Sequence, residues 1–296
     1  MRVLSLFDGI SCGRVALDKV GIDVSAYYAF EIEENAIKIS NKNYPDIIRC
    51  GNVLDADFSQ FEDIDLLIGG SPCQDLSISK SKSREGLKGA KSSLFWSYKD
   101  ALDIVKPKYF LFENVASMSD ADKDIITKAL GVEPICINSS NFVAQNRERY
   151  YWTNIPVEEV KAANHSFREV MEEEVDNKFY YNKPFTLEED KTKNVIGSLD
   201  IATYETSRRV YNPDGVIGCL TCVSGGYQEK KVYDDKANKV RKLTPIEYER
   251  LQCLPDNYTA GISNTKRYTV CGNGWTVDVI AHIFKGIVGG EAIAND

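Results

Sequence analysis

The chain has 296 residues, of which 43% are hydrophobic and 27% are charged, as in a globular protein with one large domain and a smaller lobe. Its net charge of −8 excludes a surface that is basic throughout, so binding of nucleic acid would need locally concentrated positive charge. The first residues lack a signal-peptide pattern, and no apolar run is long enough to span a bilayer. We therefore expect a cytoplasmic protein with no membrane contact.

Short apolar runs alternate with helical patterns through the first half of the chain, which is typical of βαβ units. The pattern predicts an α/β protein with a doubly wound, mostly parallel sheet. The expected strands are 3–7, 25–30, 47–49, 65–68, 109–112, 135–137 and 150–152. The expected helices run through 15–17, 33–43 and 92–105.

The alternation stops after Pro156 and resumes near Leu243. Residues 156–240 are charged and rich in Asn, Asp, Gly and Tyr, which indicates an inserted small lobe. Thr244, Pro245 and Glu247 have the spacing of a capped helix start, and a last helix is expected at 277–288. We expect a first domain at 1–155, the lobe at 156–240, and a segment at 241–296 that completes the first domain.

A glycine-bearing turn, residues 7–13, follows the first expected strand and leads into a helix. In doubly wound folds, such a turn holds a nucleotide-like ligand at the helix N-terminus. The second strand ends at Glu31, whose carboxylate can accept hydrogen bonds from both hydroxyls of a ribose. The turn lacks the three-glycine dinucleotide pattern, which favours an adenosine cofactor without a pyrophosphate over NAD.

Two further strands end in groups that can carry chemistry. Residues 69–75, with the sequence Gly-Gly-Ser-Pro-Cys-Gln-Asp, place Cys73 in a polar turn after an apolar strand. Residues 113–115, Glu-Asn-Val, end the strand expected at 109–112. A buried structural cysteine is the common alternative for Cys73, but its polar, turn-forming neighbours favour a thiol and a carboxyl that share one cleft.

The remaining cysteines and the charged segments carry weaker signals. The eight cysteines are scattered and indicate reduced thiols. Cys219 and Cys222 have the CxxC spacing, but no second ligand pair accompanies them, so we expect no metal site. Lysines and arginines gather at 80–91 and at 230–242, where solvated faces and nucleic-acid contact are both open interpretations.

Five motifs in order resemble those of the cytosine C5-specific DNA methyltransferase family. They are Phe7-Asp8-Gly9, Pro72-Cys73-Gln74, Glu113-Asn114-Val115, Gln145-Asn146-Arg147-Glu148-Arg149 and Gly272-Asn273-Gly274. The resemblance covers residues 1–155 and 243–290. Some of the motif sequences are similar to those of the animal de novo enzymes. The compact chain is instead similar to bacterial or phage enzymes, which act in the bacterial or infected cell.

The resemblance implies a Rossmann-like methyltransferase that uses S-adenosylmethionine, releases S-adenosylhomocysteine and needs no metal. Cys73 would attack C6 of a flipped-out cytosine, which makes C5 nucleophilic. Glu113, with its pKa raised by burial, would meet N3 of the ring. Arg149 and Arg147 would hold O2 and support the thiolate. Residues 1–155 and 241–296 would be catalytic, and residues 156–240 would form the target recognition domain.

The resemblance also assigns binding residues. The cofactor residues are Phe7, Asp8, Gly9, Ile10, Glu31, Ile32, Asn52, Val53, Pro72, Leu94, Asn273 and Trp275. The substrate residues are Ser71, Gln74, Asn114, Gln145 and Thr221, the last at the start of a segment, 221–227, expected to enter a DNA groove. Asn52 stands where many relatives have an acid, and Gly274 replaces a common serine.

The expected partner is double-stranded DNA, bound by a monomer, with a cognate restriction enzyme as a possible genetic partner only. One alternative is a tRNA cytosine-5 methyltransferase of the same fold, since that branch shares the motifs. A second is an inactive DNA-binding paralogue, which the retained Cys73 and Glu113 disfavour. A third is a nucleotide-level enzyme that attacks C6, which predicts a folate site in place of the first glycine turn.

Overall fold

The structure is a computed structural model that describes residues 1–72, 94–190 and 192–294. Contacts between residues divide the chain into two compact units. The first unit comprises Met1–Ile137, Glu148–Glu159 and Val279–Asp296. The second unit comprises Asn138–Arg147 and Val160–Asp278.

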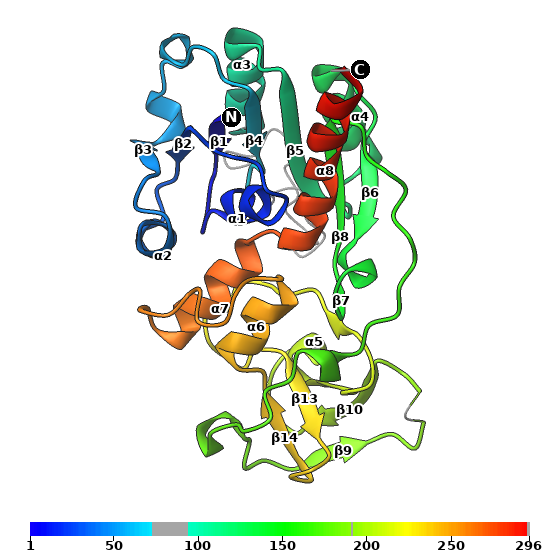
Figure 1. Cartoon of the computed structure of the whole chain (residues 1–296). Helices are drawn as coiled ribbons and strands as arrows, with labels where there is room; N and C mark the ends of the chain where they lie inside the picture. The colour runs from blue at the N-terminus through cyan, green and yellow to red at the C-terminus, as the bar shows by residue number, and fades with distance from the viewer. Residues whose placement is uncertain (73–93, 191, 295–296) are drawn as a thin grey trace. The chain divides into compact units, whose positions relative to one another are not determined.

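The first unit is built on a seven-stranded sheet in the order β3-β2-β1-β4-β5-β8-β6 (Figure 1). Its strands are β1 Arg2–Leu6, β2 Ala26–Phe30, β3 Ile48–Gly51, β4 Leu66–Gly69, β5 Tyr109–Val115, β6 Ile135–Asn138 and β8 Glu148–Thr153. Strands β1 to β5 pair in parallel with their neighbours, whereas β8 runs antiparallel to β5. The predicted α/β class and mostly parallel sheet are confirmed.

The helices of the first unit are α1 Cys12–Lys19, α2 Glu34–Asn43, α3 Phe95–Val105, α4 Asp120–Leu130 and the main part of α8 Val277–Ala294. Figure 1 shows α1 and α8 in front of the sheet. Helix α4 was not predicted, although its end signals are present. The Ser119 side chain accepts a hydrogen bond from the Asp122 N–H, and Gly131 ends the helix with a φ of 72°.

The strand order creates a switch point between β1 and β4. The chain moves outward from β1 through β2 to β3 and then returns to the other side of β1, and ligands in such folds bind at the carboxyl ends beside this reversal. Leu6, Gly69 and Phe112 pair in one row across β1, β4 and β5. Phe7 and Glu113, which follow that row, therefore lie at the same edge of the sheet.

Aromatic packing fixes the ends of β4 and β5 from one side of the sheet. The fully buried rings of Phe95 and Tyr98 on α3 contact Phe112, with ring centroids 5.2 and 4.8 Å apart. A Cβ atom on Gly69 would lie 2.9 Å from the Tyr98 ring, so only glycine fits at this strand end. The core therefore determines where the chain leaves the sheet toward Ser71.

The second unit has a five-stranded sheet in the order β14-β13-β11-β10-β9 and a pair formed by β12 and β7. These strands are β7 Gln145–Asn146, β9 Phe185–Leu187, β10 Val195–Leu199, β11 Arg209–Tyr211, β12 Ile217–Gly218, β13 Lys231–Asp234 and β14 Lys239–Lys242. Its helices are α5 Glu205–Arg208, α6 Pro245–Leu251 and α7 Asn264–Asn273. The predicted start of α6 is confirmed: Thr244 and Glu247 form a capping box with Pro245 behind the cap.

The compact units do not coincide with the three expected segments. Residues 241–278, expected with the first domain, contact the lobe and belong to the second unit, as do residues 138–147. The expected boundaries describe catalytic and recognition roles, and these roles stay predictions.

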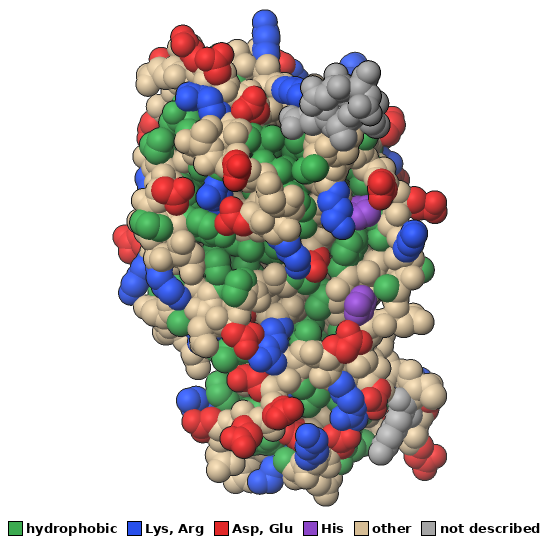
Figure 2. Space-filling model, in the orientation of Figure 1, with side chains coloured by type: hydrophobic (Ala, Val, Ile, Leu, Met, Phe, Trp, Pro, Cys, Tyr) green, Lys and Arg blue, Asp and Glu red, His purple; other side chains and the backbone are tan. Residues whose placement is uncertain are grey.

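On the face shown in Figure 2, acidic and basic side chains are interspersed over the described residues. The basic segment 80–91 lies outside the described residues. Within the described part of the chain, no helix has the length and apolar character to cross a membrane.

Candidate active site

The first turn brings Glu31 against the end of β1. The backbone N–H of Gly9 donates to Glu31 Oε2 at 2.8 Å, and the N–H groups of Ile32 and Glu33 donate to Oε1 at 2.7 and 2.8 Å. Gly9 adopts a φ of 57°, which a glycine reaches without strain. Glu31 is thus held in place by backbone amides at the predicted cofactor edge.

Asp8 was predicted to contact the cofactor, but its side chain is buried inside the protein. Its carboxylate is 1% exposed and accepts hydrogen bonds from Ser5 and Tyr27 at 2.7 and 2.8 Å, from Ser11 at 2.5 Å, and from Arg49 at 3.3 Å. Both oxygens are therefore used by the protein, beneath the turn that Gly9 forms. Arg49 was not expected as a partner of Asp8, because it lies 41 residues away on β3.

Other predicted cofactor residues differ in exposure. Ile32 is 69% exposed directly after Glu31, whereas Ile10 is 1% and Val53 8% exposed. Asn52 caps the short turn Val53–Asp55, since its side-chain oxygen accepts from the Leu54 N–H at 3.1 Å. Three further predicted cofactor residues lie in this unit. Phe7 and Leu94 pack against the core, and Pro72 is half-buried.

The ends of β4 and β5 are joined by a buried amide. Asn114, 1% exposed, donates to the carbonyl and hydroxyl oxygens of Ser71, each at 3.3 Å, and its own oxygen accepts from the Val115 N–H at 2.8 Å. Ser71 is 4% exposed. These bonds fix the chain just before Cys73 and Gln74, which lie outside the described residues.

Glu113 and Arg149 form an ion pair across β5 and β8. The distance from Arg149 Nε to Glu113 Oε1 is 2.9 Å, and the two side chains are 13% and 11% exposed. Glu113 pairs with Tyr151 and Val115 with Arg149, so the two charged residues are diagonal neighbours on one face. The antiparallel direction of β8 therefore brings the predicted acid and arginine together.

Arg147 has other partners, although it lies two residues before Arg149. It belongs to the second unit, is 5% exposed, and donates to the carbonyls of Leu220, Gly272 and Gly274 at 3.0–3.3 Å. Its Nη1 also lies 3.4 Å from Cys219 Sγ. These contacts support the backbone of the second unit, and a part for Arg147 in catalysis stays a prediction.

Gln145 is likewise engaged inside the second unit. Its amide nitrogen donates to the Leu251 carbonyl at 2.7 Å and to Gln252 Oε1 at 3.1 Å, while its oxygen accepts from the Leu220 N–H at 3.1 Å. Gln145 and Gln252 are both fully buried. The backbone of Leu220 is thus held at both of its polar groups: Gln145 accepts from its N–H, and Arg147 donates to its carbonyl oxygen.

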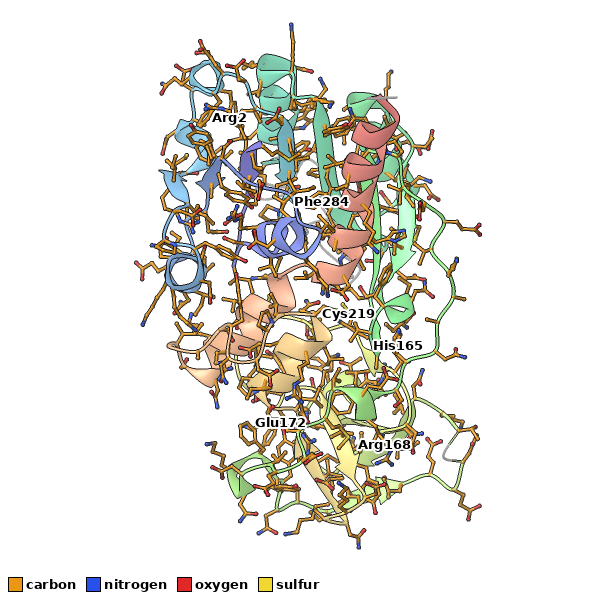
Figure 3. All side chains as sticks on the ribbon, viewed as in Figure 1. Arg2, His165, Arg168, Glu172, Cys219 and Phe284 are labelled. Carbon is orange, nitrogen blue, oxygen red and sulfur yellow. The ribbon has the colours of Figure 1, made fainter. Side chains whose placement is uncertain are left out.

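The segment around Thr221 contacts the turn that contains Asn273. Cys222 Sγ donates to Asn273 Oδ1 at 2.7 Å, and a Cβ atom on Gly272 would lie 2.5 Å from the Thr221 carbonyl. The Cys219 sulfur, labelled in Figure 3, approaches Arg147 instead. Among the residues that the structure describes, no group of three or more His, Cys, Asp or Glu side chains has a metal-binding arrangement.

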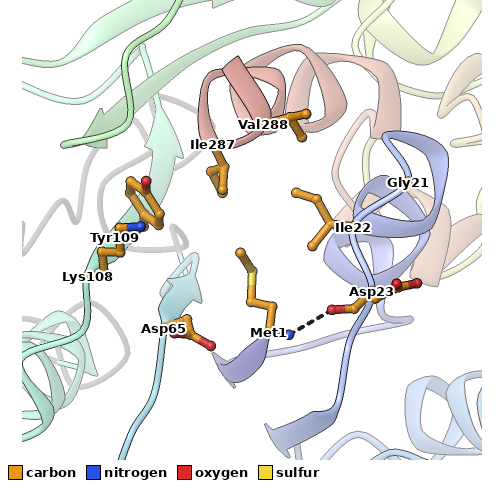
Figure 4. Close-up of a pocket in the computed structure, with 9 residues that line it drawn as sticks. All are labelled: Met1, Gly21, Ile22, Asp23, Asp65, Lys108, Tyr109, Ile287 and Val288. Atoms are coloured by element: carbon orange, nitrogen blue, oxygen red, sulfur yellow. Dashed lines mark hydrogen bonds between the residues drawn. The ribbon is translucent and has the colours of Figure 1, made fainter. Parts of the chain in front are cut away.

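A cavity of about 370 Å³ in the first unit lies away from these residues (Figure 4). It is lined by Met1, Asp65 and Tyr109, which stand at the amino ends of β1, β4 and β5, and by Ile287 of α8. Glu31, Ser71 and Glu113 all lie at the opposite, carboxyl ends of strands. The cavity is therefore separate from the candidate active site.

Similar sequences are found among cytosine C5 methylases and phage methyltransferases. The sequence model of C-5 cytosine-specific DNA methylase matches residues 1–289. The orphan methyltransferase M.SPRI of Bacillus phage SPR is 24% identical, and the match covers 97% of each chain. The orphan methyltransferase M.Rho11sI of Bacillus phage rho11s is 27% identical over 76% of this chain and 58% of its own.

Solved structures share the fold. The Entamoeba histolytica methyltransferase EhMeth superposes with a TM-score of 0.72 at 18% identity, over 97% of this chain and 98% of its own. A Spodoptera frugiperda DNMT2 mutant superposes with a TM-score of 0.68 at 20% identity, over 97% of this chain and 99% of its own. Because the family match extends over nearly the whole sequence, the chain belongs to the C-5 cytosine-specific DNA methylase family.

Proposed function

We propose that this chain transfers the methyl group of S-adenosylmethionine to C5 of cytosine in double-stranded DNA, with Cys73 as the nucleophile. Membership of the family supports cytosine C5 methylation. The observation that carries the catalytic assignment is the pairing of Glu113 with Arg149 at the carboxyl edge of the sheet. Asn114 and Ser71 join this edge to the strand that leads toward Cys73.

The residues at the first turn suit S-adenosylmethionine. Glu31 is oriented by three backbone amides and can accept hydrogen bonds from ribose hydroxyls. Ile32 offers an exposed apolar side chain for a flat purine ring. When bound, the cofactor supplies an electrophilic methyl group on a positively charged sulfur. We assign Asn273 and Trp275 to the same ligand from the family motif alone.

The chain's own residues act on the cytosine ring. A bond from Cys73 Sγ to C6 turns C5 into a nucleophilic carbon. Glu113, after it takes up a proton, donates a hydrogen bond to N3 and stabilises the electron density that enters the ring. Arg149 is placed to orient Glu113 and to donate to O2. After C5 is methylated, loss of the C5 proton and cleavage of the bond from Cys73 to C6 restore the aromatic ring and the thiolate.

DNA is the proposed substrate because the chain has an added lobe in the place of the family's target recognition domain, residues 156–240. A cytosine inside a duplex must be flipped out to meet Cys73, and this costs a few kcal/mol that contacts with the rest of the duplex offset. The lysine-rich segment 80–91 is assigned to DNA contact because it directly follows Cys73. The alternative substrate is tRNA, since the tRNA branch of the family shares the motifs.

A mechanism-based substrate tests the nucleophile. Duplex DNA with 5-fluorocytosine at the target should form a covalent adduct with the protein in the presence of S-adenosylmethionine, because fluorine cannot leave as a proton does. Mass spectrometry should place the adduct on Cys73. The control variant Cys73→Ser should form none, and an adduct in that variant would show that another residue attacks C6.

A second experiment identifies the nucleic acid. Purified protein should transfer radioactive methyl groups to unmethylated duplex DNA and not to tRNA. Expression in cells that lack DNA methylation, followed by bisulfite sequencing, should then reveal the sequence context. Labelling of tRNA alone would contradict the proposed substrate and leave the cytosine C5 chemistry in place.

A further inference from the structure

The segment from Gly218 to Gln228 in the second unit has an uncommon composition for a proposed DNA-binding surface. It contains no charged side chain. Phosphate contacts are made mainly by Lys and Arg, whereas base edges and faces are contacted by uncharged polar and aromatic groups as well. The segment is therefore suited to contact with bases rather than with the phosphate backbone.

The backbone of this segment is held by side chains from outside it. Gln145 and Arg147 bond the two sides of the Leu220 peptide, and the Thr269 hydroxyl donates to the Val223 carbonyl at 2.7 Å. Leu220 and Val223 are 1% and 3% exposed. Such anchoring lowers the entropy that the segment would otherwise lose on binding.

The tip of the segment is a strained turn. Gly225, Gly226 and Tyr227 have φ values of 114°, 66° and 63°, so three successive residues are in the left-handed region. Tyr227 pays a steric cost there that the glycines do not. Tyr227 is nevertheless 41% exposed, so burial of the residue does not by itself explain the conformation. The Ser224 N–H and hydroxyl both bond Gln228 Oε1 and close the turn.

A buried lysine bonds the backbone of Tyr227. Lys231 on β13 is 1% exposed, and its Nζ donates to the carbonyl oxygens of Tyr227 and Glu229 at 2.6 and 2.8 Å. The Lys231 ammonium lies 5.6 Å from the centre of the Tyr181 ring, which in turn lies 5.9 Å from the Tyr227 ring. The positive charge of Lys231 is thus used within the protein and is not presented to phosphate.

We propose that Lys231 is a positioning residue that holds the turn at Gly225–Tyr227, and that Tyr227 is the residue which this turn presents to a nucleobase of the substrate. The inference rests on the proposed function, because it takes DNA as the substrate. Tyr227 stacks on or packs against a base, and Lys231 acts on binding only through the turn.

The protonation state of Lys231 supplies an independent readout. Burial, together with the charges of Lys230 and Lys242 and against the opposing charge of Glu229, lowers the pKa of Lys231 to about 8. The Tyr181 ring faces the same ammonium. Above this pH the neutral amine bonds the two carbonyls more weakly, so the KM for DNA should rise as the pH is raised through 8.

The test uses the full chain with unmethylated plasmid DNA and measures kcat and KM over a series of salt concentrations and pH values. Tyr227→Ala and Lys231→Met should each raise the KM for DNA about tenfold and leave kcat within about twofold, as expected for loss of one stacked base. The slope of log kcat/KM against log salt should stay unchanged, because no phosphate contact is removed. Lys231→Met should also abolish the rise in KM above pH 8.

Two variants serve as controls. Tyr227→Phe should retain the wild-type KM because the ring is kept. Tyr204→Ala removes an aromatic side chain of the same unit that is 83% exposed and has no comparable anchor, and it should behave as wild type. Should Lys231→Met fail to fold, the exposed position of Tyr227 keeps the Tyr227→Ala measurement valid.

The outcomes separate the two proposals. A wild-type KM in Tyr227→Ala, or a salt slope about one unit shallower, would overturn the role of Tyr227 in base contact. A pH profile of KM that is the same in wild type and Lys231→Met would overturn the positioning role of Lys231. Failure of the wild-type chain to methylate any DNA would contradict the proposed function instead.

Discussion

Glu113 and Arg149 are two charged side chains in a setting with little access to water, at 11% and 13% exposure. An ion pair so placed is sensitive to the loss of either partner, because the remaining charge stays in a site with little access to water. The pair also orients the carboxyl group, which matters more for catalysis than for folding. A variant that keeps the shape of Glu113 therefore distinguishes chemistry from structure.

The variant Glu113→Gln should bind S-adenosylmethionine as the wild type does and lose at least about a hundredfold in kcat, the usual contribution of a positioned acid or base. Calorimetric titration with the cofactor and a methyl-transfer assay on DNA measure the two properties. Glu62→Gln, an exposed position in the same unit, is the matched control. Full activity of Glu113→Gln would remove this residue from the mechanism.

Asp8 illustrates a residue that supports a ligand turn from beneath. Asp8→Ala removes a buried carboxylate that accepts from four side chains and leaves the Arg49 guanidinium without its acid. The expected cost is about 3 kcal/mol of unfolding free energy, as for one partner of a buried ion pair. Urea denaturation measures it, and the exposed Asp124→Ala should change the free energy by less than about 0.5 kcal/mol.

At the scale of elements, β14 and α6 are joined by a buried ion pair in the second unit. Arg241 and Glu247 are both fully buried and form two hydrogen bonds at 2.6 and 2.8 Å. Glu247 also accepts from the N–H of Thr244 at 2.8 Å and from the N–H of Glu172 at 3.1 Å. One carboxylate thus caps the helix and binds the neighbouring strand.

Single and double substitutions should affect this joint differently. Glu247→Met should lower the unfolding free energy by about 3–5 kcal/mol, since the buried Arg241 guanidinium loses both hydrogen bonds to Glu247 and keeps the more distant carboxylate of Asp234, 3.6 Å from its Nε. The double variant Arg241→Met, Glu247→Met should be less destabilised than the single variant, because no buried guanidinium remains. Chemical denaturation of the three proteins measures the difference. Equal or greater loss in the double variant would show that the ion pair itself, rather than its disruption, determines stability.

At the scale of the whole molecule, a low pH should destabilise the second unit by protonating the two carboxylates that Arg168 binds. Arg168 is labelled in Figure 3. Arg168 binds Asp214 and Asp235, and its hydrogen bonds lower the pKa of both carboxyls. A lowered pKa gives stability that is present above the unfolded value, near 4, and that is lost as the pH falls through the lower folded value. These groups are partly exposed, so salt screens the effect.

The variant Arg168→Met should therefore begin to unfold at a higher pH than the wild type when the pH is lowered from 5 to 2. The two proteins should differ less in 0.5 M salt than in 0.05 M salt. Circular dichroism during an acid titration measures both midpoints. Coincident midpoints at low salt would show that this cluster adds nothing to acid stability.

The sequence alone determined the class of fold and the order of the motifs. Strand periodicity is local, so β1 to β5 and the helices α2 and α3 follow from patterns within each segment. The cap of α6 follows from Thr244, Pro245 and Glu247 in the same way. Helix α4 and the short strands of the second unit were not predicted, because their apolar patterns are brief and their pairing partners lie far along the chain.

Only the tertiary structure decided which chemical groups meet. Arg147 and Arg149 are two residues apart in the sequence, yet the antiparallel pairing of β8 with β5 brings Arg149 to Glu113, while Arg147 bonds carbonyls of the second unit. The burial of Lys231 beneath Tyr227 is likewise invisible in a run of charged residues. Strand direction and burial depend on contacts between distant segments, which local residue patterns do not encode.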